Sequence, residues 1–170
     1  MSAPQTLPVG VLVERRKGVS KWADVNWRSV GILPAVPVTA PWTKLSGDDN
    51  ATVFYAGAAE IELHASDTQN YLYNLQSRKP SLWVRLRAGA GDQPHNVVAV
   101  TADPSEGESF TEAGDDLVDA VAMPETIRSA LEAFVAANHV ERPFQKRERD
   151  RADPEALSRG PPTRQDSGHE

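Results

Sequence analysis

Hydrophobic residues recur at every second position in three separate segments of the chain. Successive side chains of a β-strand point to opposite faces, so a period of two predicts strands with one buried face. The alternating residues are Val9, Val11 and Val13, then Ile61 and Leu63, then Leu82, Val84 and Leu86. We therefore expect strands to dominate the first hundred residues.

Turn residues and prolines divide this half of the chain into short strands. Pro34, Pro37 and Pro41 each fix φ and lack an N–H, which predicts an extended connector or an edge. Ala56-Gly57 predicts the turn of a hairpin between two strands. The predicted strands are residues 7–14, 27–33, 51–55, 59–64, 82–87, 96–102 and 117–122.

Three helices are predicted from capping signals and helical periodicity. Ser66–Gln69 has the spacing of a capping box, and a helix to Ser77 would place Tyr71, Leu72 and Leu75 on one face. Asp103–Glu106 is a second capping signature, with a proline at the first helical position and a short helix to about Ala113. The third predicted helix, 124–138, has apolar residues at the helical period: Ile127, Leu131, Phe134 and Val135.

These elements predict an α+β fold. We expect a mostly antiparallel sheet of five to seven strands, or a partly open barrel, with short helices and a C-terminal helix covering one face. Residues 7–148 would form a single domain after a flexible N-terminus, 1–6. Residues 149–170 are rich in Pro, Gly, Ser and mixed charge, a composition that predicts a disordered tail.

Composition excludes several classes of function. The chain has no cysteine, which excludes disulfides, thiolate catalysis and cysteine-held iron–sulfur clusters. Its net charge of −6 argues against general nucleic-acid binding. No apolar run approaches the ~20 residues that span a bilayer, and residues 1–8 lack the features of a secretory signal. We expect a protein of the bacterial cytoplasm that binds neither membrane nor nucleic acid, and the sequence predicts no cofactor.

Charge is unevenly distributed along the chain. Between Ala88 and Ile127 there are nine acidic residues and no lysine or arginine, whereas Glu14–Arg28 and Arg78–Arg87 are basic. Such a surface suits oriented docking of a protein partner. The predicted partner-binding residues are Trp83, Arg85 and Arg87, which share one strand face, with Arg78 and Lys79 nearby. The structural alternative is that Trp83 packs under a loop while the arginines are solvated.

Three of the four tryptophans lie within about twenty residues of one another. Trp22, Trp27 and Trp42 form either a satellite core under the N-terminal loops or a groove lined with aromatic rings. In the second case they would line a ligand pocket, with a polar group such as Asp24 or His64 inside it.

Two acidic clusters are candidate metal sites. Glu60, Glu62 and His64 alternate on one strand face and could hold a divalent cation, but a solvated strand face is the favoured interpretation, since a metal site would need further ligands from elsewhere. Asp115, Asp116 and Asp119 lack the spacing of an EF-hand loop and fit a solvated acidic loop. His139 ends the last helix, where a capping role suffices. We therefore predict no metal site, and the chain has no Walker A, G-x-G-x-x-G, G-x-S-x-G or H-E-x-x-H motif.

Four segments in order resemble one protein family. They are VGVLVERR at Val9–Arg16, WRSVGILP at Trp27–Pro34, YLYNLQSRKP at Tyr71–Pro80 and HVERPFQKR at His139–Arg147. The chain is similar over roughly Leu7–Glu148 to domain-of-unknown-function family 3305, a proteobacterial family without assigned catalytic or binding residues. The resemblance implies a gene neighbourhood with molybdenum- or tungsten-dependent formate dehydrogenases and their chaperones.

Three hypotheses for the function follow. The first is a non-catalytic cytoplasmic accessory or assembly protein whose partner is a formate dehydrogenase subunit or its chaperone, as the resemblance implies. The second is a small-molecule-binding protein or enzyme that uses the tryptophan-lined pocket. The third, ranked last, is a nucleic-acid contact through Lys146, Arg147, Arg149 and Arg151, because interleaved acids cancel most of that charge.

Overall fold

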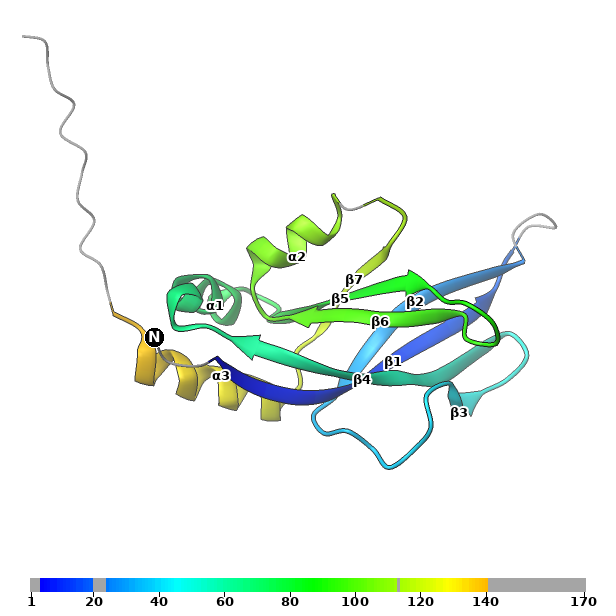
Figure 1. Ribbon diagram of the computed structural model, residues 1–170, viewed down its shortest axis with the longest axis horizontal. Coiled ribbons are helices and arrows are strands. Elements are labelled where there is room, and N and C mark those ends of the chain that lie inside the picture. The colour runs from blue at the N-terminus through cyan, green and yellow to red at the C-terminus, as the bar shows by residue number, and fades with distance from the viewer. Residues whose placement is uncertain (1–3, 20–23, 113, 141–170) are drawn as a thin grey trace, which may run out of the picture. The chain divides into compact units, whose positions relative to one another are not determined.

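The computed structural model describes residues 4–19, 24–112 and 114–140 (Figure 1). The predictions for Trp22, for the 149–170 tail and for the basic residues Lys146, Arg147, Arg149 and Arg151 concern residues outside these ranges. The strands are β1 (Gln5–Lys17), β2 (Val25–Leu33), β3 (Thr43–Gly47), β4 (Ala51–Leu63), β5 (Ser81–Ala88), β6 (His95–Thr101) and β7 (Leu117–Ala122). The helices are α1 (Thr68–Gln76), α2 (Pro104–Phe110) and α3 (Glu125–Asn138), and a single 3-10 turn, η1 (Ala65–Asp67), precedes α1.

The strands form two antiparallel sheets. The first has four strands in the order β2-β1-β4-β3, and the second has three in the order β6-β5-β7. The prediction of a mostly antiparallel fold is confirmed, but one continuous sheet of five to seven strands is wrong, and the strands do not close into a barrel. The long central strands β1 and β4 pair along almost their whole length, from Gln5 opposite Leu63 to Arg16 opposite Ala51.

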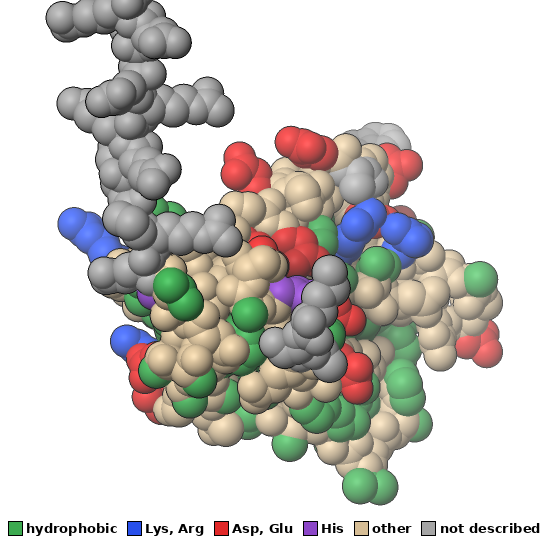
Figure 2. Space-filling model, turned by 60° about the vertical axis from the view of Figure 1, so that its left-hand side comes forward, with side chains coloured by type: hydrophobic (Ala, Val, Ile, Leu, Met, Phe, Trp, Pro, Cys, Tyr) green, Lys and Arg blue, Asp and Glu red, His purple; other side chains and the backbone are tan. Residues whose placement is uncertain are grey.

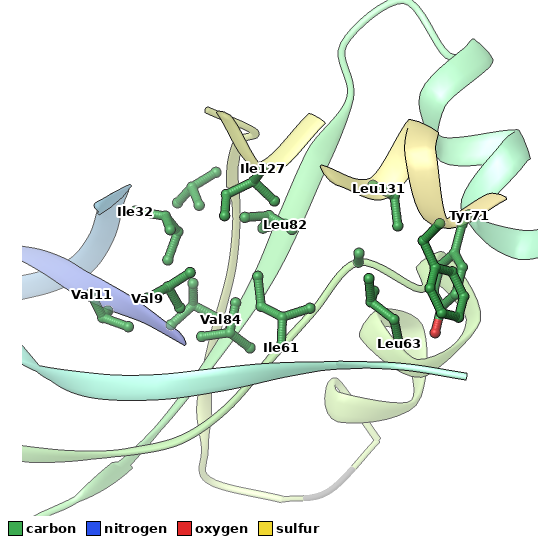
Figure 3. Packing of buried hydrophobic residues seen from close by; sticks show 14 of the residues in the cluster. Val9, Val11, Ile32, Ile61, Leu63, Tyr71, Leu82, Val84, Ile127 and Leu131 are labelled. Atoms are coloured by element: carbon green, nitrogen blue, oxygen red, sulfur yellow. The ribbon is translucent and has the colours of Figure 1, made fainter. Parts of the chain in front are cut away.

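The hydrophobic core lies between the two sheets. Strand β4 lies beside β6 and strand β2 beside β7, so the inner faces of the sheets share one cluster of buried side chains. Figure 3 shows these side chains from β1, β4, β5 and α3 pointing toward one another. Val9, Ile61 and Leu82 are fully buried there. The alternation of the sequence is thereby confirmed, because its apolar positions are the ones that point inward.

Strand β4 corrects one prediction. Ala56-Gly57 is not a hairpin turn, because the chain continues through it as one strand. Gly57 has φ +148°, and the register with β1 shifts between Val11 and Leu12, which are paired with Gly57 and Tyr55. This is a β-bulge, where a glycine accommodates the unusual backbone. The hairpin turn lies earlier, between β3 and β4, where the Asp48 carboxylate accepts the N–H groups of Asn50 and Ala51.

Helix α1 is attached to the three-stranded sheet by a buried asparagine that sequence analysis missed. The Asn74 side chain donates to the carbonyls of Ser81 and Ala102, both at 2.8 Å, and accepts from the Ser81 N–H at 3.0 Å. All of these groups lie at the ends of β5 and β6. The predicted capping box at Ser66 does not form, since no side chain caps α1 and its first turn is the 3-10 turn η1.

The other two helices agree with the sequence. The Asp103 carboxylate accepts the Ser105 N–H at the start of α2, with Pro104 in the first turn, although α2 ends at Phe110 rather than near Ala113. In α3 the predicted apolar residues are buried. Their burial contributes at most about 6–12 kcal/mol to the free energy of folding, before the cost in chain entropy is subtracted. Helix α3 packs against α1 and adds its apolar side chains to the shared core. No helix in the described ranges is long and apolar enough to cross a membrane.

Tyr71 provides a test of the packing between α1 and β4. Its hydroxyl accepts the His64 N–H at 3.0 Å and donates to the Glu62 carbonyl at 3.5 Å, while its ring is buried in the core. We expect Tyr71→Phe to lower the free energy of unfolding by about 1–2 kcal/mol at neutral pH, because the His64 N–H loses its partner. Urea unfolding measures this change.

The same variant has a predictable pH dependence. Burial raises the pKa of the Tyr71 phenol from 10.0 to about 12. The unfolded chain therefore loses this proton first, and the wild type is destabilised as the pH rises from 10.0 to about 12. Tyr71→Phe lacks this loss, so the stability difference between the two proteins should narrow in that window. An unchanged difference would contradict the burial of the hydroxyl.

Candidate functional site

The predicted partner-binding face of β5 is largely covered by other parts of the domain. Trp83, Arg85 and Arg87 lie on its outward face, as their alternation with buried Leu82, Val84 and Leu86 predicts. Helix α2 lies directly on Trp83, because a Cβ built at Gly107 would overlap the indole ring. Trp83 is therefore half-buried beneath a helix, close to the structural alternative in which it packs under a loop.

The two arginines of β5 are paired with one carboxylate. The carboxylate of Asp116, just before β7, accepts a hydrogen bond from Arg85 Nε at 2.5 Å. It also accepts two from Arg87, from Nε at 3.1 Å and from Nη2 at 3.0 Å. The hydrogen bonds from Arg87 and then Arg85 lower the pKa of Asp116, and the Arg87 pKa is raised in turn. Arg85 also lies over the Phe110 ring of α2, at 5.5 Å.

The acidic segment thus folds against the basic strand instead of forming a separate region. Asp116 holds Arg85 and Arg87, and the Asp119 carboxylate accepts the Ser29 N–H of β2 at 2.9 Å. Arg78 and Lys79, in the turn before β5, are exposed. A docking role for the five predicted residues stays a prediction, but three of them already have partners inside the domain.

A cluster of aromatic side chains forms a different surface. Trp27 of β2, Trp42 before β3 and Phe54 of β4 lie with their ring centroids 5.7–6.0 Å apart, and Trp27 meets Trp42 edge to face. The Arg15 guanidinium of β1 lies over Phe54 at 5.5 Å. We call Arg15, Trp27, Trp42 and Phe54 the aromatic surface. It lines an open pocket of about 450 Å³, together with Gly91, Asp92 and Pro94.

Trp27 and Trp42 have features of both interpretations, the satellite core and the open groove. Trp27 and Trp42 are half-buried and pack against the core, and their outer surfaces line the open pocket. Asp24 and His64 line other depressions, so neither supplies the predicted polar group. Arg15 and Asp92 are the ionisable residues that line this pocket. Sequence analysis missed Arg15 and Phe54, because they come from two further strands and have no spacing that relates them to the tryptophans.

Trp42 is held in an unusual backbone conformation. Its φ is +68°, a value that a bulky residue rarely adopts. Its indole Nε1 donates to the His95 carbonyl at 3.1 Å, and the His95 ring lies 5.5 Å from Trp27. Burial lowers the pKa of His95. These contacts fix the Trp42 ring beside the pocket, and backbone strain of this kind is common at functional sites.

The predicted face of β4 lines a second depression. Glu60, Glu62 and His64 lie along a groove of about 320 Å³ between β4 and β6, which Glu106 of α2 also lines. The His64 Nε2 atom lies 3.3 Å from a carboxylate oxygen of Glu62. Acidic side chains gather on the face shown in Figure 2, with histidine among them. In the described part of the chain, no three histidine, aspartate or glutamate side chains form a group that could hold a metal ion.

The remaining candidates have structural contacts. Asp116 accepts hydrogen bonds from Arg85 and Arg87, and Asp119 accepts one from the Ser29 N–H, so these two acids of the candidate calcium cluster have protein partners. His139 follows the last residue of α3, and its N–H donates to the Val135 carbonyl. The His139 ring lies 3.0 Å from the Thr68 hydroxyl, which connects α3 to the start of α1.

Comparisons with known proteins gave one result. A family model described as "Protein of unknown function (DUF3305)" matches residues 8–148, which is most of the chain. No curated protein and no solved structure matches it.

The contact between α2 and Trp83 can be tested at Gly107. In an exposed helix, Gly→Ala is stabilising by about 1 kcal/mol, but here the added methyl meets the indole. We expect Gly107→Ala to lower the free energy of unfolding by about 1–3 kcal/mol and to change tryptophan fluorescence. Glu108→Ala, at an exposed position of the same helix, is the control and should stay within about 0.5 kcal/mol of the wild type. A stabilising Gly107→Ala would show that α2 does not lie on Trp83.

Proposed function

The chain belongs to the DUF3305 family of proteins of unknown function, and we propose that it is a non-catalytic accessory protein that binds a protein partner through the aromatic surface. The proposed partner is a subunit, or the chaperone, of a molybdenum- or tungsten-dependent formate dehydrogenase in the bacterial cytoplasm. The gene neighbourhood implied by the family resemblance supports this choice of partner.

The aromatic surface is the observation that carries the proposal. Tryptophan and arginine contribute much of the binding energy in protein interfaces. Here two tryptophans and a phenylalanine from three segments converge on an open depression, and the Arg15 side chain lies across one of the rings. The two tryptophan rings are held by the core and by the Trp42–His95 hydrogen bond, so little of their side-chain entropy is lost on binding.

The contacts of the aromatic surface also indicate the chemistry of the partner. Apolar side chains would enter between the rings, and an acidic group would pair with Arg15, which is exposed. The β5 face is less suited to docking, because α2 covers Trp83 and Asp116 pairs with Arg85 and Arg87. Its exposed residues, Arg78 and Lys79, therefore serve as the comparison.

The test is co-purification with a tagged formate dehydrogenase subunit or chaperone at low salt. The wild type should be recovered, and Arg15→Glu should weaken binding about tenfold or more. The matched Arg78→Glu/Lys79→Glu protein should bind as the wild type does. Loss of binding only in the Arg78/Lys79 variant would move docking to the β5 face, and no recovery of the wild type would overturn the choice of partner.

A second candidate function is small-molecule binding in the same pocket, because its volume of about 450 Å³ suits a compact ligand. A metabolite panel screened by thermal unfolding would then contain a compound that raises Tm in the wild type and not in Arg15→Glu. If no compound raises Tm at millimolar concentration, this candidate is rejected. Neither outcome depends on the co-purification result.

A further inference from the structure

We propose that the groove between β4 and β6 binds an extended basic segment of a partner protein, which adds as a β-strand. This site lies on a different surface from the aromatic surface and uses different residues. The inference goes beyond the proposed function and can fail without it.

Two strand edges without partners face each other across this groove. Strand β3 pairs with β4 only from Thr52 to Tyr55, and β1 occupies the opposite edge of β4 as far as Leu63. Strand β6 pairs with β5 along one edge. Within the described residues, no backbone hydrogen bond joins β4 to β6 although they lie side by side (Figure 1). The edges that remain are the kind that extended peptides use.

Tyr71 shows how the end of the β4 edge is already satisfied. Its hydroxyl accepts the His64 N–H and donates to the Glu62 carbonyl, as a peptide group on a neighbouring strand would. Backbone groups of alternate residues point to the same edge, so those of Glu60 point the same way. On the opposite edge of β4, Glu60 is paired with Pro8 of β1, and Pro8 has no N–H to donate to the Glu60 carbonyl. We infer that the free hydrogen-bonding groups of Glu60 point into the groove.

Strands β4 and β6 are in side-chain contact at one end of the groove. A Cβ built at Gly57 would lie 3.7 Å from a Val97 methyl group, so the strands are in side-chain contact there. Beyond Gly57 the groove of about 320 Å³ opens between Ala58–His64 and Val97–Thr101. At about 3.3 Å per residue, the β4 side of the groove matches a segment of roughly six residues.

The charge of the lining specifies the chemistry of the segment. Glu60, Glu62 and Glu106 line the groove, and His64 is the one basic side chain among its lining residues. Glu60 and Glu62 are two residues apart on one strand face and are both exposed. Side chains at alternate positions of an added strand lie opposite such a pair. The occupant is therefore an extended segment with Lys or Arg at every second position.

Selection from a display library of random octapeptides tests the proposal. We expect enrichment of sequences with Lys or Arg at alternate positions and without internal proline. A selected peptide should bind Glu60→Lys/Glu62→Lys at least tenfold more weakly, and its Lys-to-Glu version should bind that variant better than the wild type. Glu108→Lys/Glu112→Lys carries the same charge change on acids that do not line the groove, and it should bind as the wild type does.

Amide hydrogen exchange separates strand addition from simple charge attraction. The selected peptide should slow exchange at the Glu60 N–H and along β6, and Arg15→Glu should leave its affinity unchanged. The proposal is overturned if no basic sequence is enriched, if charge reversal at Glu60 and Glu62 has no effect, or if the peptide binds without protecting these amides. Circular dichroism melts of each variant confirm that it is folded.

Discussion

The two sheets are joined through their side chains. Within the described residues, no main-chain ladder crosses from β4 to β6 or from β2 to β7, and the inner faces instead share one apolar cluster. The sheets therefore depend on burial of residues such as Val9, Ile61 and Leu82 to remain together. Where β2 meets β7, the Asp119 carboxylate bonds to the Ser29 N–H and takes the place of a strand partner. Where β4 meets β6, the gap stays open as a groove.

This arrangement explains why polar side chains at the sheet ends matter. Asn74 makes three hydrogen bonds to main-chain groups at the ends of β5 and β6, and Tyr71 bonds to main-chain groups at the end of β4. The Asn74 and Tyr71 side chains are buried, so replacing either one leaves main-chain groups without these hydrogen-bond partners. Both residues belong to α1, which therefore holds the ends of the two sheets in register with each other.

The charge pattern has a different meaning in three dimensions than along the chain. The acidic stretch after Ala88 and the basic strand β5 carry opposite charges and lie close together in the fold. Asp116 neutralises Arg85 and Arg87, and α2 covers Trp83 through Gly107. The surface that we propose for docking instead combines Arg15, Trp27, Trp42 and Phe54, which come from four segments and line one open pocket. A linear charge count identifies groups that can pair, and the fold decides which of them are already paired.

The sequence alone predicted the elements whose signals are local. A period of two places Leu82, Val84 and Leu86 on one face of a strand, and Asp103 before Pro104 begins a helix, because both effects depend only on near neighbours. Strand β3 and the course of β4 through Gly57 were missed, since a glycine with positive φ serves equally in a turn and in a bulge. Tertiary structure decided the rest: the division into two sheets, the partners of Asp116, and the meeting of Arg15 with the aromatic rings. These depend on contacts between residues distant in the chain, and no local spacing records them.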